Sequence, residues 1–304
     1  MKYAHVSRSL NFNYIRVLCY YLQRLVTQPF LRSVAIYCLQ RVVGAGTLST
    51  GEAGAAVDET LSTLRADGIA PLGQLFTDEK CAEILTYLKD KQLTHKSFPG
   101  GVFSAELHPE HVRLGDYSIE DLVHCPHVLA SVNNVEMIAL ASRFLGCTPT
   151  ISGLSARWSF PAESSDEVVQ RFHRDSEDWK AFRIIVYLTD VTKNSGPHIY
   201  VTGTHLDRKG LRLEVLSNTE TSESFPSDRI VTQTGKKGLG FAVDTAGLHK
   251  GEVPKDSPRL ILSFQYSMLP CFLYEYEPVV IDNFPYDTYM NRLICQSAKP
   301  DRRC

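Results

Sequence analysis

Residues 170–175 read Gln-Arg-Phe-His-Arg-Asp, which places His173 and Asp175 two positions apart at the head of a strand-like run. Side chains two apart on a strand point the same way, so both can reach one metal ion while Arg174 points elsewhere. A second histidine, His249, follows much further along the chain, and we expect a distant strand to supply it. Two imidazoles and one carboxylate on one face of a metal are the ligand set of non-haem Fe(II) oxygenases.

Arg259 extends this pattern. It precedes the apolar run Leu-Ile-Leu at residues 260–262, where a buried guanidinium would be costly without a partner. The planar fork of an arginine is suited to holding a dicarboxylate co-substrate by paired hydrogen bonds. A surface arginine at the start of a strand is the alternative, but the position of Arg259 after the two histidines and the aspartate favours a binding role.

With these residues in this order, the chain resembles the phytanoyl-CoA dioxygenase-like family of Fe(II)/2-oxoglutarate oxygenases, which includes ectoine hydroxylase. The likeness covers about residues 57–270. The motifs that carry it are His173-x-Asp175, Thr189-Asp190-Val191, Ser195-Gly196-Pro197-His198, Thr202-Gly203-Thr204-His205, His249 and Arg259. Relatives often read Pro-Gly-Ser-His where this chain reads Thr-Gly-Thr-His at residues 202–205, so the detail of that loop differs.

The resemblance implies a site and a reaction. Fe(II) would be held by His173, Asp175 and His249, with 2-oxoglutarate and O₂ as co-substrates and succinate and CO₂ as co-products. A C–H bond of a small-molecule substrate would be hydroxylated. Because halogenating relatives lack the carboxylate, Asp175 favours hydroxylation over halogenation, although desaturation and ring closure use the same ligands. The family's substrates include fatty acyl thioesters, amino acids, terpenoids and sugar derivatives, and the chain does not choose among them.

Further positions are candidates for the same pocket. Three of them, Ser159, Tyr187 and Thr189, are expected to contact 2-oxoglutarate, with outward-facing or cross-strand packing as the ordinary alternative. Two others, Trp179 and Arg157, are expected to border the substrate, with a core tryptophan and an outward-facing polar residue as the alternatives. The resemblance places His198 and His205 in the loop after Gly196, where a structural role is favoured over ligation.

Composition indicates a single soluble enzyme. The chain has 304 residues, 43% hydrophobic and 22% charged, which suffices for one large core. Its formal charge of -2 gives no sign of nucleic-acid binding. Its eight cysteines form no C-x-x-C pair, which argues against a zinc site and a disulfide framework. A reducing cytoplasm would also suit Fe(II).

The first 51 residues differ from the rest. They hold six basic residues and no acid, and the apolar spacing predicts two helices in a basic extension, 1–43, that divides near Pro29. Neither helix has the apolar length of a membrane span. Packing on the catalytic domain or on a second subunit of a homo-oligomer is favoured over binding to an anionic membrane surface. Residues 44–56 read as a linker and 57–304 as the oxygenase domain.

Beyond the linker, helical patterns precede strand patterns. We expect helices at 57–66, 77–91 and 133–145, a short strand at 69–72, and a long loop at 92–127. Further strands are expected at 151–160, 181–188, 198–201, 240–243 and 260–268. This order predicts an α+β fold, a double-stranded β-helix (jelly roll) with flanking helices and the N-terminal helical extension.

Two other classes of function stay open at this point. One is a catalytically degenerate jelly-roll binding protein, which the complete ligand set argues against. The other is a cupin-like metalloenzyme that works without 2-oxoglutarate, a reading that leaves Arg259 unexplained.

Overall fold

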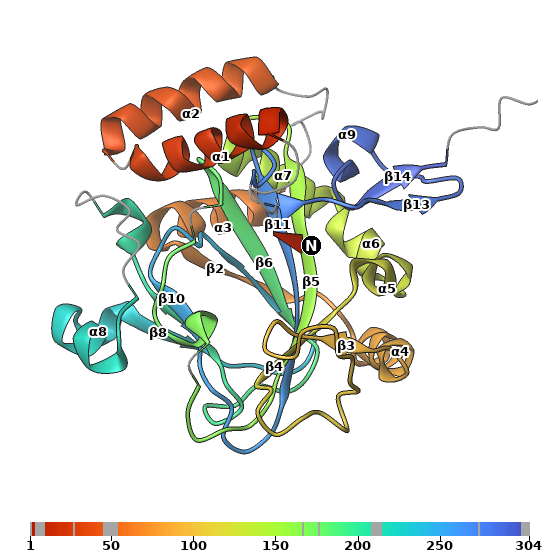
Figure 1. Cartoon of the computed structure of the whole chain (residues 1–304). Coiled ribbons are helices and arrows are strands. Elements are labelled where there is room, and N and C mark those ends of the chain that lie inside the picture. The colour runs from red at the N-terminus through yellow and green to blue at the C-terminus, as the bar shows by residue number, and fades with distance from the viewer. Residues whose placement is uncertain are drawn as a thin grey trace, which may run out of the picture.

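The structure, a computed structural model, describes residues 2–3, 10–26, 28–44, 54–165, 167–175, 177–207, 215–272 and 274–298 (Figure 1). Most of the expected linker, residues 45–53, lies outside the described residues. None of the described helices is long and apolar enough to cross a membrane.

A large antiparallel sheet forms the centre of the molecule. Its seven strands run in the order β2-β9-β6-β11-β5-β4-β3. Their bounds are β2 (Ile69–Gln74), β9 (Leu239–Val243), β6 (Ala181–Tyr187), β11 (Arg259–Ser267), β5 (Thr150–Ser159), β4 (Leu114–Tyr117) and β3 (Leu93–Thr94). Because β11 pairs with both β5 and β6, Arg259 starts the central strand of this sheet.

A smaller sheet packs on one face of the large one. Its strands, β10 (His249–Gly251), β7 (His198–Val201) and β8 (Ile230–Gln233), are antiparallel in that order. Tyr200 of β7 belongs to the same buried cluster as Ile185 of β6 and Phe241 of β9, so apolar side chains join the two sheets. The two sheets form the expected double-stranded β-helix.

The alternation along β6 shows how one strand serves two cores. Phe182, Ile184 and Val186 belong to the main core, whereas Ile185 and Tyr187 face the smaller sheet. The main core lies between the large sheet and the helices α3 (Ala55–Asp67), α4 (Asp78–Lys89), α5 (Ile119–His124), α6 (Val128–Val132) and α7 (Val135–Leu145). The period-two pattern of the sequence therefore predicts both faces of the strand.

Helix ends follow the expected capping chemistry. Thr77 caps α4 by accepting a hydrogen bond from the backbone N–H of Lys80 at 3.4 Å, and Asn134 caps α7. Gly68 ends α3 at φ 82°, and a Cβ there would lie 2.1 Å from the Tyr200 hydroxyl. Only glycine fits both this backbone angle and this contact.

The expected loop at 92–127 is wrong in part. It contains β3, β4 and α5, and β4 pairs with β5 so that Asp116 lies opposite Arg157. The elements that the sequence did not indicate also include β1 (Lys2–Tyr3), α8 (Asn218–Ser224), β8, β12 (Tyr274–Glu275), β13 (Val279–Ile281), α9 (Thr288–Asn291) and β14 (Cys295–Ser297). Most of these elements are too short to give a periodic signal in the sequence. The strands among them form by pairing with segments elsewhere in the chain.

The N-terminal helices, α1 (Leu10–Leu25) and α2 (Pro29–Val43), lie against the oxygenase domain (Figure 1). The Arg32 guanidinium donates to the backbone oxygens of Asp178 at 2.9 Å and Trp179 at 2.7 Å. Gln40 donates to the backbone oxygen of Leu145 at 2.7 Å. β1 adds a further attachment, because it pairs antiparallel with β12.

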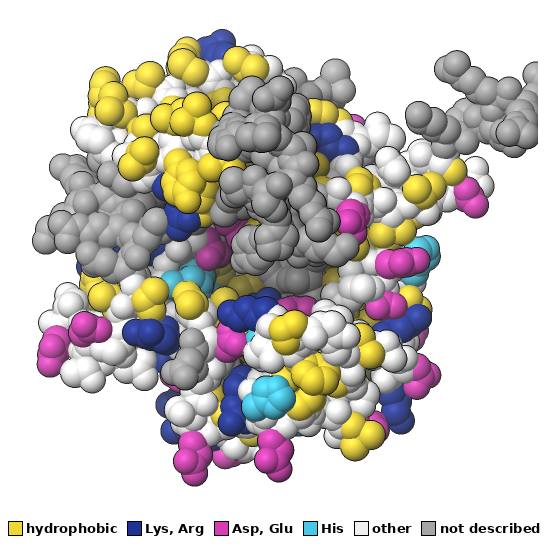
Figure 2. Space-filling view, viewed as in Figure 1, with side chains coloured by type: hydrophobic (Ala, Val, Ile, Leu, Met, Phe, Trp, Pro, Cys, Tyr) yellow, Lys and Arg dark blue, Asp and Glu magenta, His cyan; other side chains and the backbone are white. Residues whose placement is uncertain are grey.

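The outward face of α1 and α2 is apolar (Figure 2). Leu25 is 75% exposed and Val42 is 82% exposed. The other large apolar side chains exposed on the two helices are Leu18, Tyr21, Leu22, Phe30, Leu31, Val34 and Tyr37. Arg16, like Arg32, bonds to the oxygenase domain, through the backbone oxygen of Tyr274, whereas Arg41 is exposed.

Candidate active site

His173 and His249 lie directly opposite each other across an antiparallel bridge. The N–H of His173 donates to the oxygen of His249 at 2.9 Å, and the N–H of His249 donates to the oxygen of His173 at 3.0 Å. This hydrogen-bonded pairing places the two imidazoles on one side of the bridge, with ring centroids 4.4 Å apart. The distant strand that was expected to supply the third ligand, His249, is thus β10.

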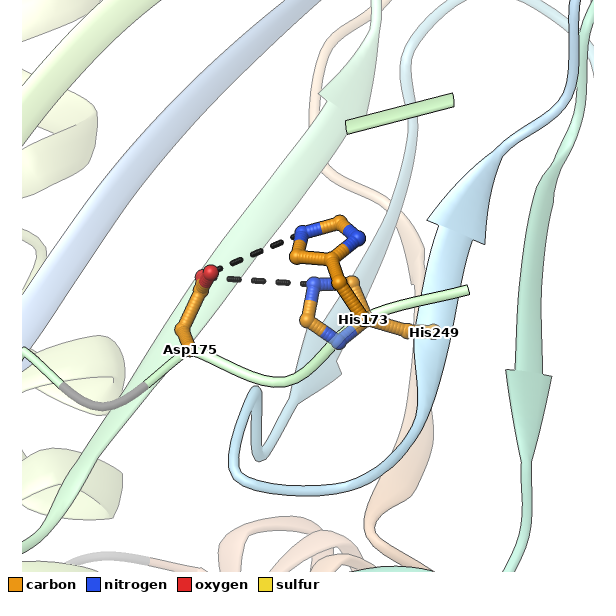
Figure 3. A group of neighbouring side chains, drawn as sticks. All are labelled: His173, Asp175 and His249. Atoms are coloured by element: carbon orange, nitrogen blue, oxygen red, sulfur yellow. Dashed lines mark ion pairs between the residues drawn. The ribbon is translucent and has the colours of Figure 1, made fainter. Parts of the chain in front are cut away.

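Asp175 completes the group (Figure 3). Its Oδ1 lies 3.5 Å from His173 Nε2, and its Oδ2 lies 3.9 Å from His249 Nε2. The three possible ligand atoms all lie within 4.8 Å of one another. The strand-like run expected at His173 and Asp175 is an extended segment and not a regular strand: Phe172 and His173 form single bridges, and the Asp175 N–H donates to the oxygen of Thr245 at 2.8 Å.

Both histidines have one ring nitrogen engaged by the backbone. His173 Nδ1 lies 2.8 Å from the oxygen of Arg171, and His249 Nδ1 lies 2.9 Å from the oxygen of Gly247. A carbonyl oxygen only accepts, so each Nδ1 carries a proton, and in the neutral form of each imidazole the lone pair is on Nε2, toward Asp175. This backbone support fixes the tautomer that metal ligation by Nε2 requires.

The charge state of the group also suits a metal. Burial, together with the nearby His173, lowers the pKa of His249 to about 4. Burial by itself would raise the pKa of the Asp175 carboxyl, but His249, Arg183 and His173 outweigh it and hold that pKa below its ordinary value. His249 is therefore neutral and Asp175 is ionised at neutral pH, the states in which both groups bind metals.

A chain of polar side chains supports Asp175 from behind. Arg183 Nε lies 3.4 Å from Asp175 Oδ2, and Arg183 Nη2 lies 2.9 Å from Glu177 Oε2. The Tyr274 hydroxyl donates to Glu177 Oε1 at 2.6 Å. Sequence reasoning missed these three residues. Strand parity was the available signal for Arg183, because it shares a face of β6 with Ile185 and Tyr187, and all three line the cavity described next.

A cavity of about 610 Å³ opens onto the histidines and Asp175. Of the other residues expected at the site, Arg157, Ser159, Tyr187 and Arg259 line it. Such a volume lies within the usual range for small-molecule sites, ~300–1,000 Å³. The cavity wall also includes Tyr20 and Arg24 of α1, which the sequence gave no reason to place there.

Arg259 is buried at the edge of this cavity, with only 4% of its surface exposed. Its Nη1 donates to the oxygen of Gly196, and its Nη2 donates to Ser159 Oγ at 3.0 Å. Its Nε is buried without a hydrogen-bond partner, and no carboxylate of the described residues pairs with it. A buried, unpaired guanidinium of this kind fits a carboxylate ligand.

Tyr187 and Thr189 have their hydroxyl groups engaged by the backbone. The Tyr187 hydroxyl donates to the oxygen of Gln233 at 2.7 Å and accepts from the N–H of His198 at 3.1 Å, and burial raises its pKa to about 12. Thr189 Oγ1 accepts from the N–H of Leu260 at 3.1 Å. The structure does not bring Thr189 into the cavity wall, because it lies past the end of β6.

Trp179 also lies outside the cavity wall. It packs against the main core, and the Arg32 guanidinium lies 5.4 Å from its ring centroid. Trp179 thus has the packing role that the sequence gave as the alternative.

Arg157, in contrast, lines the cavity. It forms a two-point ion pair with Asp116, at 2.7 and 3.0 Å.

The two remaining histidines differ in position. His198 is buried in the cavity wall, with its ring centroid 5.6 Å from that of His249, and burial holds its pKa well below the ordinary value. It does not join the group of possible metal ligands. His205 Nε2 lies 3.0 Å from the oxygen of Arg65, on α3.

Three comparisons with known proteins bear on this site. The family model described as phytanoyl-CoA dioxygenase matches residues 64–252, a span that includes His173, Asp175 and His249. A comparison of the sequence with curated proteins gives no match. Solved structures show the same fold at low sequence identity.

One similar structure is EctD from S. alaskensis with 2-oxoglutarate and 5-hydroxyectoine: 17% identity, TM-score 0.53, covering 84% of this chain and 92% of that chain. Another is HygX from Streptomyces hygroscopicus with nickel, 2-oxoglutarate and hygromycin B bound: 16% identity, TM-score 0.50, covering 79% and 95%. A third is the epimerase SnoN with Fe3+, alpha ketoglutarate and nogalamycin RO: 18% identity, TM-score 0.50, covering 70% and 84%. At such identities these likenesses support the jelly-roll fold, and the family match carries the assignment. The chain belongs to the phytanoyl-CoA dioxygenase family and is an Fe(II)/2-oxoglutarate-dependent oxygenase.

Proposed function

We propose that the chain hydroxylates a C–H bond of a small-molecule substrate. In the balanced reaction, one oxygen atom of O₂ enters the substrate as a hydroxyl group and the other enters succinate as 2-oxoglutarate loses CO₂. The observation that carries the proposal is the position of Asp175 beside His173 and His249 at one cavity that also contains Arg259.

The residues present fit both groups that the reaction needs. Two imidazoles and one carboxylate match Fe(II), and His173, His249 and Asp175 would hold it on one side. Arg259 and Ser159 would hold the distal carboxylate of 2-oxoglutarate, since the Arg259 Nε is buried without a partner. When bound, the metal and 2-oxoglutarate together supply the activation of O₂.

The protein's own contribution is orientation and exclusion of water. Arg183 lies 3.4 Å from Asp175, so its charge keeps that carboxyl ionised and turned toward the histidines. Ile185 and Ile261 line the cavity and give the substrate an apolar wall. The complete carboxylate ligand favours hydroxylation over halogenation, and the Arg259 position favours an enzyme that uses 2-oxoglutarate over a cupin-like metalloenzyme without it.

The test is a substrate screen with Fe(II), 2-oxoglutarate and ¹⁸O₂, read by mass spectrometry. We expect succinate and a product that has gained one labelled oxygen atom. Asp175→Ala should abolish both, whereas Asp228→Ala, a change at an exposed carboxylate, should have no effect. A product that has lost two hydrogens without gaining oxygen would replace hydroxylation with desaturation or ring closure. Full activity in Asp175→Ala would refute the ligand assignment.

A further inference from the structure

The cavity wall is rich in positive charge. Its cationic side chains among the described residues are Arg24, Lys96, Arg157, Arg174, Arg183 and Arg259. Four of them have carboxylate partners: Lys96 with Glu167 at 2.7 Å, Arg157 with Asp116 at 2.7 Å, Arg174 with Asp207 at 3.8 Å, and Arg183 with Glu177 at 2.9 Å. Within the part of the chain that the structure describes, Arg24 and Arg259 have none. The proposed function accounts for Arg259 through 2-oxoglutarate, and it leaves Arg24 without a role.

Arg24 is held in place by its own helix. Its guanidinium lies 4.7 Å from the centroid of the Tyr20 ring, and its Nη1 donates to the Tyr20 hydroxyl. Its Nε is buried and has no hydrogen-bond partner. A buried donor left unpaired is costly, and among the described residues no acceptor bonds to this Nε. Burial lowers the pKa of Arg24, but an arginine stays protonated in proteins.

The anchoring of α1 explains why Arg24 faces the cavity. Arg16, Tyr20 and Arg24 are four residues apart, so they lie on one side of the helix. Arg16 bonds to the backbone oxygen of Tyr274, and Tyr20 is only 6% exposed. Gln23, which immediately precedes Arg24, is buried and donates to Asp178 at 3.5 Å. The helix is thereby fixed with its arginine side toward the oxygenase domain.

We propose that Arg24 and Tyr20 form a subsite for an anionic group of the substrate, a carboxylate or a phosphate. The inference deepens the proposed function by naming a substrate class: a small molecule with a negative charge at one end and the oxidised C–H bond near the histidines. A guanidinium with free N–H groups over an aromatic ring is suited to such an anion. The cavity of about 610 Å³ holds both 2-oxoglutarate and such a substrate.

The test measures anion binding and does not depend on turnover. Full-length protein is loaded with Ni(II) and 2-oxoglutarate, so that the positions at the metal and at Arg259 are filled. Phenyl phosphate, benzoate and the neutral benzamide are then titrated by calorimetry. We expect at least one anion to bind about tenfold more tightly than benzamide, because one charge-assisted hydrogen bond lowers a dissociation constant by about that factor. The tighter of the two anions identifies the group as phosphate or carboxylate.

Variants assign the preference to the subsite. Arg24→Gln should remove the anion preference while its melting curve shows a folded protein, and Arg24→Lys should restore part of it. Arg41→Gln, at the exposed arginine of α2, is the matched control and should keep the preference. Equal binding of benzamide and both anions, no anion binding at all, or an unchanged preference in Arg24→Gln would each overturn the inference. Failure of the proposed function would appear separately, as absence of succinate from the Fe(II)-loaded wild type.

Discussion

His173 and His249 exchange both of their backbone hydrogen bonds, at 2.9 and 3.0 Å, so the pairing that fixes the chain also sets the spacing of the two imidazoles. A slip of one residue in this pairing would turn one imidazole to the opposite side. The site therefore depends on the register between a segment that precedes β6 and a strand that follows β9.

Metal binding should stabilise the fold, because the ion links these two segments in the folded state only. At about a hundredfold excess of Ni(II) over its dissociation constant, we expect a gain of ~2.7 kcal/mol in unfolding free energy. His173→Ala should lose this gain, whereas His124→Ala, at an exposed histidine on α5, should retain it. Urea unfolding with and without metal measures the difference, and an equal gain in His173→Ala would contradict the assignment.

Arg259 should govern the affinity for 2-oxoglutarate. Arg259→Leu removes the guanidinium that we expect to pair with the distal carboxylate, and we expect a loss on the order of 2–5 kcal/mol. Titration of the metal-loaded protein with 2-oxoglutarate gives the value directly. Arg259→Lys should recover only part of the affinity, because an ammonium lacks the planar fork. Wild-type affinity in Arg259→Leu would exclude this role.

Asp178 should make stability depend on pH. Burial raises the pKa of its carboxyl to about 7, above the ~3.9 of an unfolded aspartate. The folded chain then binds the proton more tightly, so the contribution to stability is full below about pH 4 and is lost as the pH rises through 7. Asp178→Asn has no charge to bury. Its amide oxygen can still accept from the N–H groups of Met268 and Leu269, which bond to one carboxylate oxygen, Oδ2.

We therefore compare the difference in unfolding free energy, Asp178→Asn minus wild type, at two pH values. We expect this difference to be larger at pH 8 than at about pH 4, by on the order of 4 kcal/mol. Urea unfolding at several pH values provides the measurement. Parallel pH profiles for the two proteins would show that the carboxyl titrates normally in the folded state.

Deletion of residues 1–44 should lower the melting temperature and the solubility. The truncation removes the bonds of Arg32 to Asp178 and Trp179, and it exposes apolar surface now covered by the two helices. Arg32→Ala should produce a smaller shift in the same direction. An unaltered melting curve, together with strong, salt-dependent vesicle flotation of the full-length chain, would indicate a lipid surface as the main partner of the extension. Light scattering on both proteins tests whether a second copy covers the apolar face of α1 and α2.

The sequence predicts the metal site and the main strands because both have local signals. His173, Asp175 and His249 are recognisable by residue type and order, and strands such as 181–188 and 260–268 are rich in aliphatic and aromatic residues. The structure contains these strands as β6 and β11. Ligand order and strand composition are visible without knowledge of any contact between distant residues.

The parts that could not be predicted depend on such contacts. The strand β4 is four residues long and includes a glycine, so only its pairing with β5 gives it a strand conformation. The positions of Asp116 and Arg24 follow from tertiary packing, and neither has a motif. The sequence places Tyr187 and Thr189 on the strand that follows the proposed metal ligands, but it does not show that their hydroxyl groups are already bonded to backbone atoms.

The wall of the cavity is divided between two parts of the chain, one inside the family-matched residues and one outside them. The proposed metal ligands lie inside the family-matched residues 64–252, whereas Tyr20 and Arg24 lie on a helix that precedes them. Substitutions in α1 can thus alter which molecules enter without disturbing oxygen activation. Grafting this helix onto another jelly-roll oxygenase offers a route to changed selectivity, because α1 brings Tyr20 and Arg24 to the cavity wall without contributing to the two sheets.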